Sequence, residues 1–223
     1  IGFFSDEVMA VPKISYDFQA PIGEFGLVRD SYQYLRILHT FLKEFGAILA
    51  PMETVLPEGN ERITPDNRET LRYAARMKGD SGFIFMTNFQ DHDTARIDQA
   101  GLQIKLNLQN ETLMIPAKGT FTLKKDVSAI LPFHLHMQDA VLKYATAQLL
   151  TKIEDNGNEH YLFFAPEGFV PEYSFDKHTL KSGKAFYTPE AGTRSTFSIT
   201  TKAGKKILIT TLTHEQALNA VKV

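Results

Sequence analysis

The chain has 223 residues, 43% of them hydrophobic, with 24 basic and 26 acidic residues and a formal net charge of -2. This size and composition predict a globular chain with a buried core of its own. Because the charges nearly balance, there is no broad cationic surface of the kind that binds phosphates or anionic lipid, so we expect neither a nucleic-acid partner nor a membrane partner.

Cysteine is absent, which excludes disulfides and thiolate chemistry. No run approaches the roughly 20 apolar residues that a membrane helix needs. The first ten residues, IGFFSDEVMA, carry acids where a secretion signal would carry basic residues. No glycine-rich phosphate loop is expected, because GKAF and AGKK lack the strand-loop-helix setting of such loops.

Residues 11–22 are predicted to form a short buried strand that stops at Pro21. Alternation along a strand places Tyr16 and Phe18 on one face and Gln19 on the other. A polar turn follows, and then the clearest helix pattern in the chain.

That helix is predicted to begin with Asp30 as its cap, paired with Gln33 three residues on, and to end at Gly46. Its apolar residues fall on one stripe, which consists of Tyr34, Leu35, Leu38, Phe41, Leu42 and Phe45. A strand followed at once by an amphipathic helix is an α/β unit, and one such unit cannot cover its own apolar faces. We therefore expect it to join a larger sheet.

Residues 51–80 are rich in Pro, Gly, Glu, Asn and Arg, which indicates a linker, with one or two helical turns around Glu69 to Met77. Beyond it the segments are short and rich in Val, Ile, Thr, Phe and Tyr. In chain order they are GFIFMTN, LQIKLNL, ETLMIP, TFTLKK, AILPFHLHM, AVLKYATAQLLTKI, HYLFFAPE, RSTFSITT and KKILITTL. Their spacing predicts an antiparallel β-sandwich or barrel.

Two tight hairpins are predicted, at residues 155–158 (DNGN) and 202–205 (KAGK), because both contain glycine where a turn requires a positive φ. A short helix is predicted from Thr213, with Thr213 and Gln216 forming a capping box. The expected division of the chain is a βα unit in residues 1–50, a linker in 51–80 and an antiparallel β domain in 81–223.

The run SYDFQAPIGEFG, residues 15–26, resembles the T-S-Y-D-Y-D-A-P-L-x-E-x-G run that ends the catalytic barrel of glycoside hydrolase family 35, the β-galactosidases. The following DSYQYLRILHTFL is similar to that barrel's last helix. Farther along, LKYATAQ (142–148) and FFAPEG (163–168) are similar to segments of the family's β domain. The resemblance implies a mainly β fold, namely an antiparallel β-sandwich preceded by the terminal strand and helix of a TIM-type barrel.

The resemblance also implies where the chemistry lies. A retaining galactosidase needs a general acid and a nucleophile, two carboxylates about 5 Å apart. In this family they are glutamates at the ends of the fourth and seventh barrel strands, and both would lie upstream of residue 1. We therefore expect a chain without catalytic residues, cofactor or metal, which supports the barrel of its parent enzyme. Its partners would be the rest of that parent chain and a carbohydrate. The resemblance further suggests an extracytoplasmic enzyme, either periplasmic or secreted.

Barrel strands present active-site groups at their C-terminal ends, so Tyr16, Phe18, Gln19 and Glu24 are the candidate substrate-binding residues. Phe18 and Gln19 stand where the family has a sugar-facing Tyr and an Asp, which leaves two readings: an altered glycoside specificity, or a hydroxyl supplied from elsewhere. Tyr16 and Phe18 could instead be aromatics that fill a barrel layer. For Glu24 we favour an ion pair with Arg29 over a role as a loop acid.

Two polar clusters could hold metal ions. His134 and His136 share a strand face, with Asp139 as a possible third ligand, but two polar strand residues are the favoured interpretation. The segment Asp91-His92-Asp93 could bind calcium, although a solvated turn is favoured.

Three aromatics bear on the alternative functions. Tyr161, Phe163 and Phe169 could form a sugar-stacking platform, but strand aromatics in a sandwich are more often core residues. Such a platform would make the chain a stand-alone carbohydrate-binding β-sandwich, the alternative to the scaffold function. A third alternative is a structural module that forms a homo-oligomer, because the apolar stripe of the helix must be buried somewhere.

Overall fold

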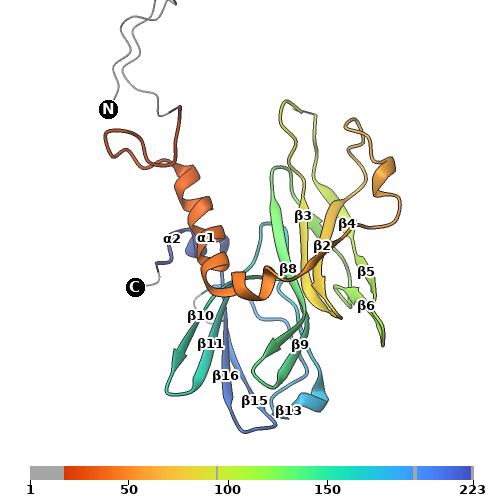
Figure 1. Ribbon diagram of the computed structural model, residues 1–223, viewed down its shortest axis with the longest axis vertical. Coiled ribbons are helices and arrows are strands. Elements are labelled where there is room, and N and C mark those ends of the chain that lie inside the picture. Colours follow the sequence, from red (N-terminus) through yellow and green to blue (C-terminus); the bar gives the residue numbers. More distant parts are fainter. Residues whose placement is uncertain (1–17, 94, 193–194, 222–223) are drawn as a thin grey trace, which may run out of the picture.

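The computed structural model describes residues 18–93, 95–192 and 195–221. The fold is mainly β, with two large sheets that face each other and a helix at each end of the described chain (Figure 1). These helices are α1 (Asp30–Leu49) and α2 (His214–Asn219), and two short 3-10 turns, η1 (Asn60–Arg62) and η2 (Lys177–Thr179), lie between them. In the described residues neither α-helix is both long and apolar enough to cross a membrane.

The first large sheet has seven strands. In spatial order these are β1 (Glu53–Val55), β2 (Arg72–Lys78), β3 (Ser81–Thr87), β8 (Ser128–Met137), β9 (Ala140–Ala145), β12 (Tyr173–Phe175) and β14 (Phe186–Tyr187). Each pair of neighbours runs antiparallel.

The second large sheet has five strands. In spatial order these are β10 (Gln148–Asp155), β11 (Asn158–Phe164), β16 (Lys206–Leu212), β15 (Thr196–Thr201) and β13 (Leu180–Ser182). The β11–β16 pair is parallel, whereas the other three pairs are antiparallel. Two small ribbons pair β4 (Gln99–Leu102) with β7 (Phe121–Leu123) and β5 (Ile104–Asn107) with β6 (Thr112–Ile115).

The main core lies between the two large sheets and continues beneath α1. Phe83, Leu142 and Tyr173 come from the first sheet, and Phe163 and Ile209 from the second, and they share one buried cluster. A second cluster on the opposite face of the first sheet is covered by the two ribbons. This layering confirms the predicted antiparallel β-sandwich.

Several local predictions are confirmed. The DNGN hairpin joins β10 to β11, with positive φ at Asn156 and Gly157, and the KAGK turn joins β15 to β16. The capping box of α2 is present, because the Thr213 hydroxyl accepts from the Gln216 N–H at 3.1 Å and the Gln216 side chain accepts from the Thr213 N–H at 2.9 Å.

The predicted ends of α1 are wrong. Its N-cap is Arg29, whose side chain makes no capping hydrogen bond. Asp30 lies inside the first turn, where its negative charge interacts favourably with the positive end of the helix dipole. Gly46 is not a terminator either: the helix runs through it to Leu49, and the Gly46 carbonyl accepts from the Ala50 N–H at 2.8 Å. The helical pattern of hydrogen bonds thus continues past Gly46, so glycine's freedom is not needed there.

The predicted linker is also wrong in part, because β1 and β2 lie within residues 51–80. The segment predicted to be helical, Glu69 to Met77, instead contributes most of β2. Ala, Arg and Met are among the best helix formers, but intrinsic propensity is only a weak preference. Pairing with β3 across the Gly79-Asp80 turn determines the local structure. The division into a barrel unit and a β domain stays a prediction.

Candidate functional site

The predicted substrate-facing residues fall on the loop that leads into α1. Tyr16 lies outside the described residues. Phe18 and Gln19 are in a turn with φ of 42° and 65°, and Phe18 is 71% exposed. The predicted strand therefore does not extend through residues 18–22, where the loop has a single antiparallel bridge between Ile22 and Val28.

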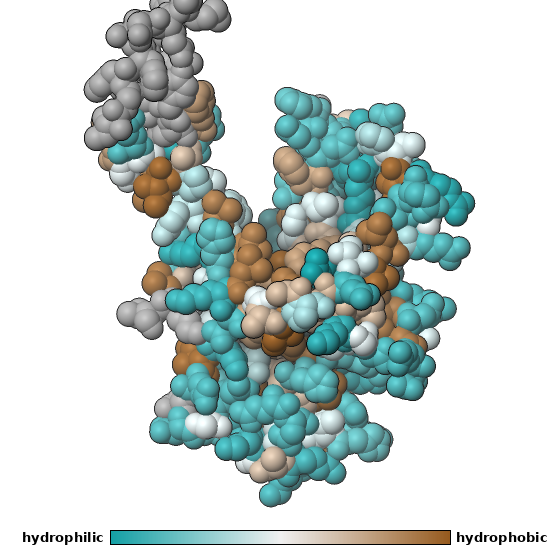
Figure 2. All heavy atoms as spheres, viewed as in Figure 1, coloured by the Kyte–Doolittle hydropathy of each residue, from teal (hydrophilic) through white to brown (hydrophobic). Residues whose placement is uncertain are grey.

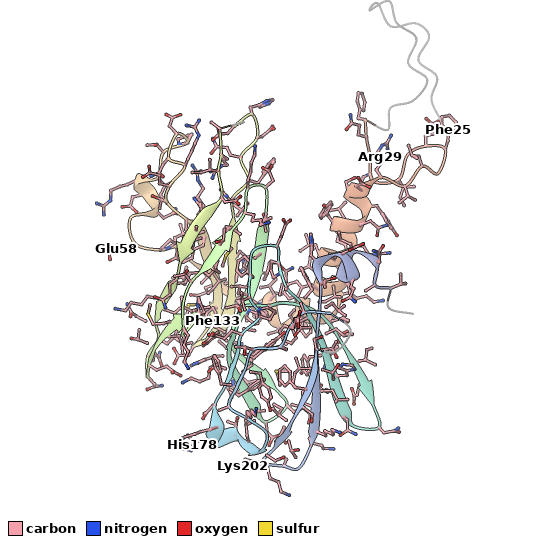
Figure 3. The ribbon with its side chains drawn as sticks, turned by 180° about the vertical axis from the view of Figure 1, so that it is seen from behind. Phe25, Arg29, Glu58, Phe133, His178 and Lys202 are labelled. Atoms are coloured by element: carbon pink, nitrogen blue, oxygen red, sulfur yellow. The ribbon has the colours of Figure 1, made fainter. Side chains whose placement is uncertain are left out.

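Backbone hydrogen bonds fix the shape of this loop. The Arg29 N–H donates to the Pro21 carbonyl at 3.0 Å, and the Arg29 side chain donates to the Ala20 carbonyl at 2.5 Å. Glu24 is half-buried in the same loop, and its ion pair with Arg29 stays a prediction. Phe18, Gln19 and Glu24 thus share one loop, and Figure 3 shows that loop at the end of α1 away from the strands, with Phe25 and Arg29 labelled on it.

The loop and α1 together carry a run of exposed apolar side chains, here called the N-terminal apolar surface. Its members are Phe18, Ile22, Phe25, Leu27, Val28, Tyr34, Leu35, Leu38 and Leu42. Apolar residues exposed singly are ordinary, but several large apolar side chains exposed on one loop and one helix are typical of a surface that another protein segment covers.

The predicted apolar stripe of α1 is divided between two environments. Phe41 and Phe45 are buried, as is Ile37, which the predicted stripe does not include. The Phe41 ring makes an edge-on contact with Phe83 of β3 at a centroid distance of 5.4 Å. Leu38 and Leu42, only one position away, remain exposed. The β domain therefore uses one side of the stripe and leaves the other side uncovered.

Two contacts hold α1 against α2 and the second sheet. The Arg36 guanidinium donates to the Leu218 carbonyl at the C-terminal end of α2, where a cation is favoured. The His214 ring stacks on Phe164 of β11 at 5.8 Å and lies 6.1 Å from the Tyr34 ring. These contacts fix the direction of α1, and so the direction in which its exposed side faces.

A groove lies between α1 and the first sheet, and Figure 2 shows hydrophobic side chains gathered in the hollow between α1 and the strands β2 and β3. We call it the α1–sheet groove. It has a volume of about 600 Å³, and its apolar lining includes Leu38, Leu56, Ala74, Phe85 and Ile130. The sequence pattern does not single out Leu56, Ala74 and Phe85 as site residues, because it predicts a linker at β2 and the groove requires β2 as its floor.

At the first candidate metal site, His134 interacts with side chains of this chain. His134 Nε2 lies 2.9 Å from Glu111 Oε1, and Lys143 pairs with the other oxygen of Glu111. His134 is thus part of an ion-pair cluster that joins β8, β9 and the β5–β6 ribbon. Across the described residues, no group of three His, Cys, Asp or Glu side chains is arranged to hold a metal ion.

The segment Asp91-His92-Asp93 is a turn, but only part of it is solvated. Asp91 and His92 are exposed and lie 3.4 Å apart. The Asp93 carboxylate is largely covered and accepts from Arg68 Nε at 2.8 and 3.0 Å. This hydrogen bond lowers the pKa of Asp93. The favoured prediction of a solvated turn is therefore wrong for Asp93.

The predicted core role of the three aromatics is confirmed. Tyr161, Phe163 and Phe169 are all buried, and Phe169 stacks on Phe121 at 4.6 Å. A sugar-stacking platform needs exposed ring faces, so these residues do not provide one.

The comparisons with known proteins agree with the fold. Residues 57–223 match the family described as β-galactosidase, domain 2. The chain belongs to this family. No curated protein sequence matches the chain significantly. The match begins after α1 and β1, so α1 and the N-terminal loop lie ahead of the matched domain.

Proposed function

We propose that this chain is the scaffold domain of a β-galactosidase of the glycoside hydrolase family 35 type, together with the last helix of that enzyme's catalytic barrel. The parent enzyme is the longer protein that would contain the whole catalytic barrel and this scaffold domain. Support comes from the family match over residues 57–223 and from the resemblance of residues 15–26 to the end of the family's barrel.

The observation that carries the proposal is the position of α1. Phe41 and Phe45 on one side of its apolar stripe are buried against the matched domain together with Ile37. Leu38 and Leu42 on the other side of the stripe are exposed. A helix that is apolar over such a wide arc is typically covered from both sides. Because α1 precedes the matched domain, the rest of the preceding domain is its natural cover.

In this arrangement the β domain has no reacting groups. The parent enzyme would hydrolyse terminal β-galactosides with retention, through a covalent glycosyl-enzyme intermediate and without a cofactor, and its two glutamates would lie upstream of residue 1. The loop with Phe18, Gln19 and Glu24 would lie at the rim of the sugar pocket. We also propose an extracytoplasmic location, on the resemblance alone.

The reading frame upstream of residue 1 provides a first test. It should encode about three hundred residues of alternating strands and helices, with glutamates at two strand ends. The purified parent enzyme should hydrolyse nitrophenyl β-galactoside, and chain 1–223 should not. Hydrolysis by chain 1–223, or a reading frame without those glutamates, would contradict the proposal.

The proposal that the barrel covers the exposed side of α1 can be tested with an introduced cysteine, since the chain has none of its own. Leu42→Cys should react with a maleimide in chain 1–223 and react about tenfold more slowly or less in the parent enzyme, because interface cores exclude water. Lys202→Cys, on the exposed β15–β16 turn, is the control and should react equally in both (Figure 3). Equal labelling of Leu42→Cys in both proteins would show that the outer side of α1 is not covered by the barrel.

The substrate loop has its own test in the parent enzyme. Phe18→Tyr restores the phenol that the family has at this position. It should raise kcat/KM for galactosides relative to other glycosides by up to about tenfold, the worth of one added hydrogen bond. An unchanged preference would place Phe18 away from the sugar and would leave the scaffold role untouched.

A further inference from the structure

The backbone at Phe18 and Gln19 is unusual for residues of these types. Their φ angles are 42° and 65°, in the left-handed region that glycine adopts easily and that a bulky residue rarely adopts. Residues held in this region cost conformational energy and cluster at active sites and ligand-binding loops, where the surrounding structure holds them. Because Phe18 is 71% exposed, burial of its ring contributes little to holding this turn.

Arg29 holds the segment that follows the turn. Its guanidinium donates to the Ala20 carbonyl at 2.5 Å, and its backbone N–H donates to the Pro21 carbonyl at 3.0 Å. The Arg29 carbonyl in turn accepts from the Tyr32 N–H at 2.9 Å, in the first turn of α1. Arg29 thus joins the two residues directly after Gln19 to the start of a helix.

We propose that Arg29 is a positioning residue of the parent enzyme, which holds the loop in the conformation that presents Phe18 and Gln19 to the sugar. This inference rests on the proposed function, because the resemblance alone places these two residues at the sugar pocket. It goes further in assigning a role to a residue outside the candidate substrate contacts. Arg29 acts through the backbone of residues 18–21 and does not touch the sugar.

The rest of the loop is closed by its own backbone. The Gly23 N–H donates to the Leu27 carbonyl at 2.8 Å, and the Gly26 N–H donates to the Gly23 carbonyl at 2.9 Å. An antiparallel bridge joins residues 22 and 28. These contacts order residues 22–28 without reaching the turn. The side chain of Arg29 extends the order to Ala20, directly beside Gln19.

The chemistry of a guanidinium suits this role. Arginine stays charged at any working pH, and a hydrogen bond from a charged donor is about twice as strong as one from a neutral donor. A lysine ammonium could also donate to the Ala20 carbonyl, but it is a point charge on a flexible stem and holds its partner less firmly. Arg29→Lys should therefore keep part of the function, whereas Arg29→Ala keeps only the backbone bond to Pro21.

The first test compares kinetic constants in the parent enzyme. Arg29→Ala should lower kcat/KM for nitrophenyl β-galactoside by about tenfold or more, with a rise in KM, because misplaced contacts weaken sugar binding. Arg29→Lys should recover part of this loss. The control is Arg62→Ala, which removes an exposed arginine of η1 that pairs with the neighbouring Glu61 at 3.3 Å. It should leave both kcat and KM unchanged.

A double-mutant cycle tests whether Arg29 acts through the turn. In a parent enzyme that already carries Phe18→Ala and Gln19→Ala, Arg29→Ala should lower kcat/KM by less than about twofold, because the contacts that it positions are gone. A residue that only stabilises the fold would give the same loss in both backgrounds.

Hydrogen exchange in chain 1–223 tests the loop without the catalytic barrel. Arg29→Ala should speed exchange of the Gly23 amide by about tenfold or more, because the loop opens more often. The amides of β11 should exchange at their original rates, which shows that the β domain remains folded.

The outcomes separate this inference from the proposed function. Faster loop exchange, together with a loss of kcat/KM that Arg29→Lys partly recovers and that disappears in the Phe18→Ala, Gln19→Ala background, supports it. A galactosidase in which Arg29→Ala behaves like Arg62→Ala overturns the inference and leaves the proposed function standing. Equal losses in both backgrounds, or unchanged exchange of the Gly23 amide, also overturn it. If the parent enzyme hydrolyses no β-galactoside, the proposed function fails and this inference fails with it.

Discussion

The Tyr144 phenol and the Glu172 carboxylate form a hydrogen-bonded pair inside the β domain. The Tyr144 hydroxyl donates to Glu172 and accepts from the Ala117 N–H at 2.9 Å, and the same N–H lies 2.8 Å from Glu172 Oε1. Burial, assisted by the hydrogen bond to Glu172, raises the pKa of Tyr144, which keeps the donor proton in place. The pair joins β9, the segment before β12 and the loop after β6.

Removing the hydroxyl should therefore weaken the fold. We expect Tyr144→Phe to lower the free energy of unfolding of chain 1–223 by about 1–3 kcal/mol, because the buried Glu172 carboxylate loses the hydroxyl that donates to it. Urea denaturation followed by circular dichroism measures the change. The control is Tyr34→Phe, whose ring is exposed and which should change the value by less than about 0.5 kcal/mol. Equal effects of the two variants would contradict this role for the pair.

The two sides of α1 give a second prediction. Phe41 is fully buried against Phe83 and Phe45. Phe41→Ala should lower the free energy of unfolding by about 3–5 kcal/mol, since it removes a large ring and leaves a cavity. Leu42→Ala, on the exposed side of the same helix, should cost less than about 1 kcal/mol in the chain alone. A large loss for Leu42→Ala in chain 1–223 would mean that the β domain already covers that side.

The sequence predicts the β domain well where strands are rich in β-branched and aromatic residues, as in β3, β8 and β16. It fails for β2, whose Arg and Ala residues carry no alternation of their own. That strand forms because β1 and β3 supply hydrogen-bonding partners on both edges. Pairing with the neighbouring strands overrides the local helix preference of β2, and composition alone does not reveal this pairing.

The candidate site is also predictable only in part from the sequence. The apolar stripe of α1 is visible in the sequence, but which half of it the β domain uses depends on the position of Phe83 and β10 in space. The groove floor cannot be predicted without β2. For the loop, the family resemblance identifies Phe18 and Gln19, whereas the positive φ of both residues is a backbone property that neither side chain favours.

Two glycines give a matched pair of backbone predictions. Gly46 lies in the interior of α1, and a Cβ there would meet nothing within 4 Å. Gly46→Ala should raise the free energy of unfolding by about 0.5–1 kcal/mol, because alanine loses less entropy in a helix. At Gly82 of β3 a Cβ would lie 2.2 Å from the Arg76 carbonyl oxygen and 2.7 Å from the Phe133 ring. Gly82→Ala should therefore lower the free energy of unfolding by about 1–3 kcal/mol or more. In thermal melts, the unfolding midpoint should rise for Gly46→Ala and fall for Gly82→Ala. A shift of both midpoints in the same direction would contradict this prediction.

The ring of His160 should make stability depend on pH near neutrality. The ring is half-buried in β11, with Nε2 2.8 Å from the Thr210 hydroxyl, and burial lowers its pKa below the ordinary value of 6.5. The unfolded chain then binds a proton more readily than the folded chain, so stability is retained above pH 6.5 and falls as pH drops from there through the lowered pKa. Urea midpoints at pH 7.5 and 5.5 should differ for the unmodified chain, and His160→Gln should reduce that difference. His178→Gln is the control, since its ring is exposed at the far end of the β domain (Figure 3). Carboxylates titrate mostly below this window, so a pH dependence between 7.5 and 5.5 that survives in His160→Gln would assign the effect to another group.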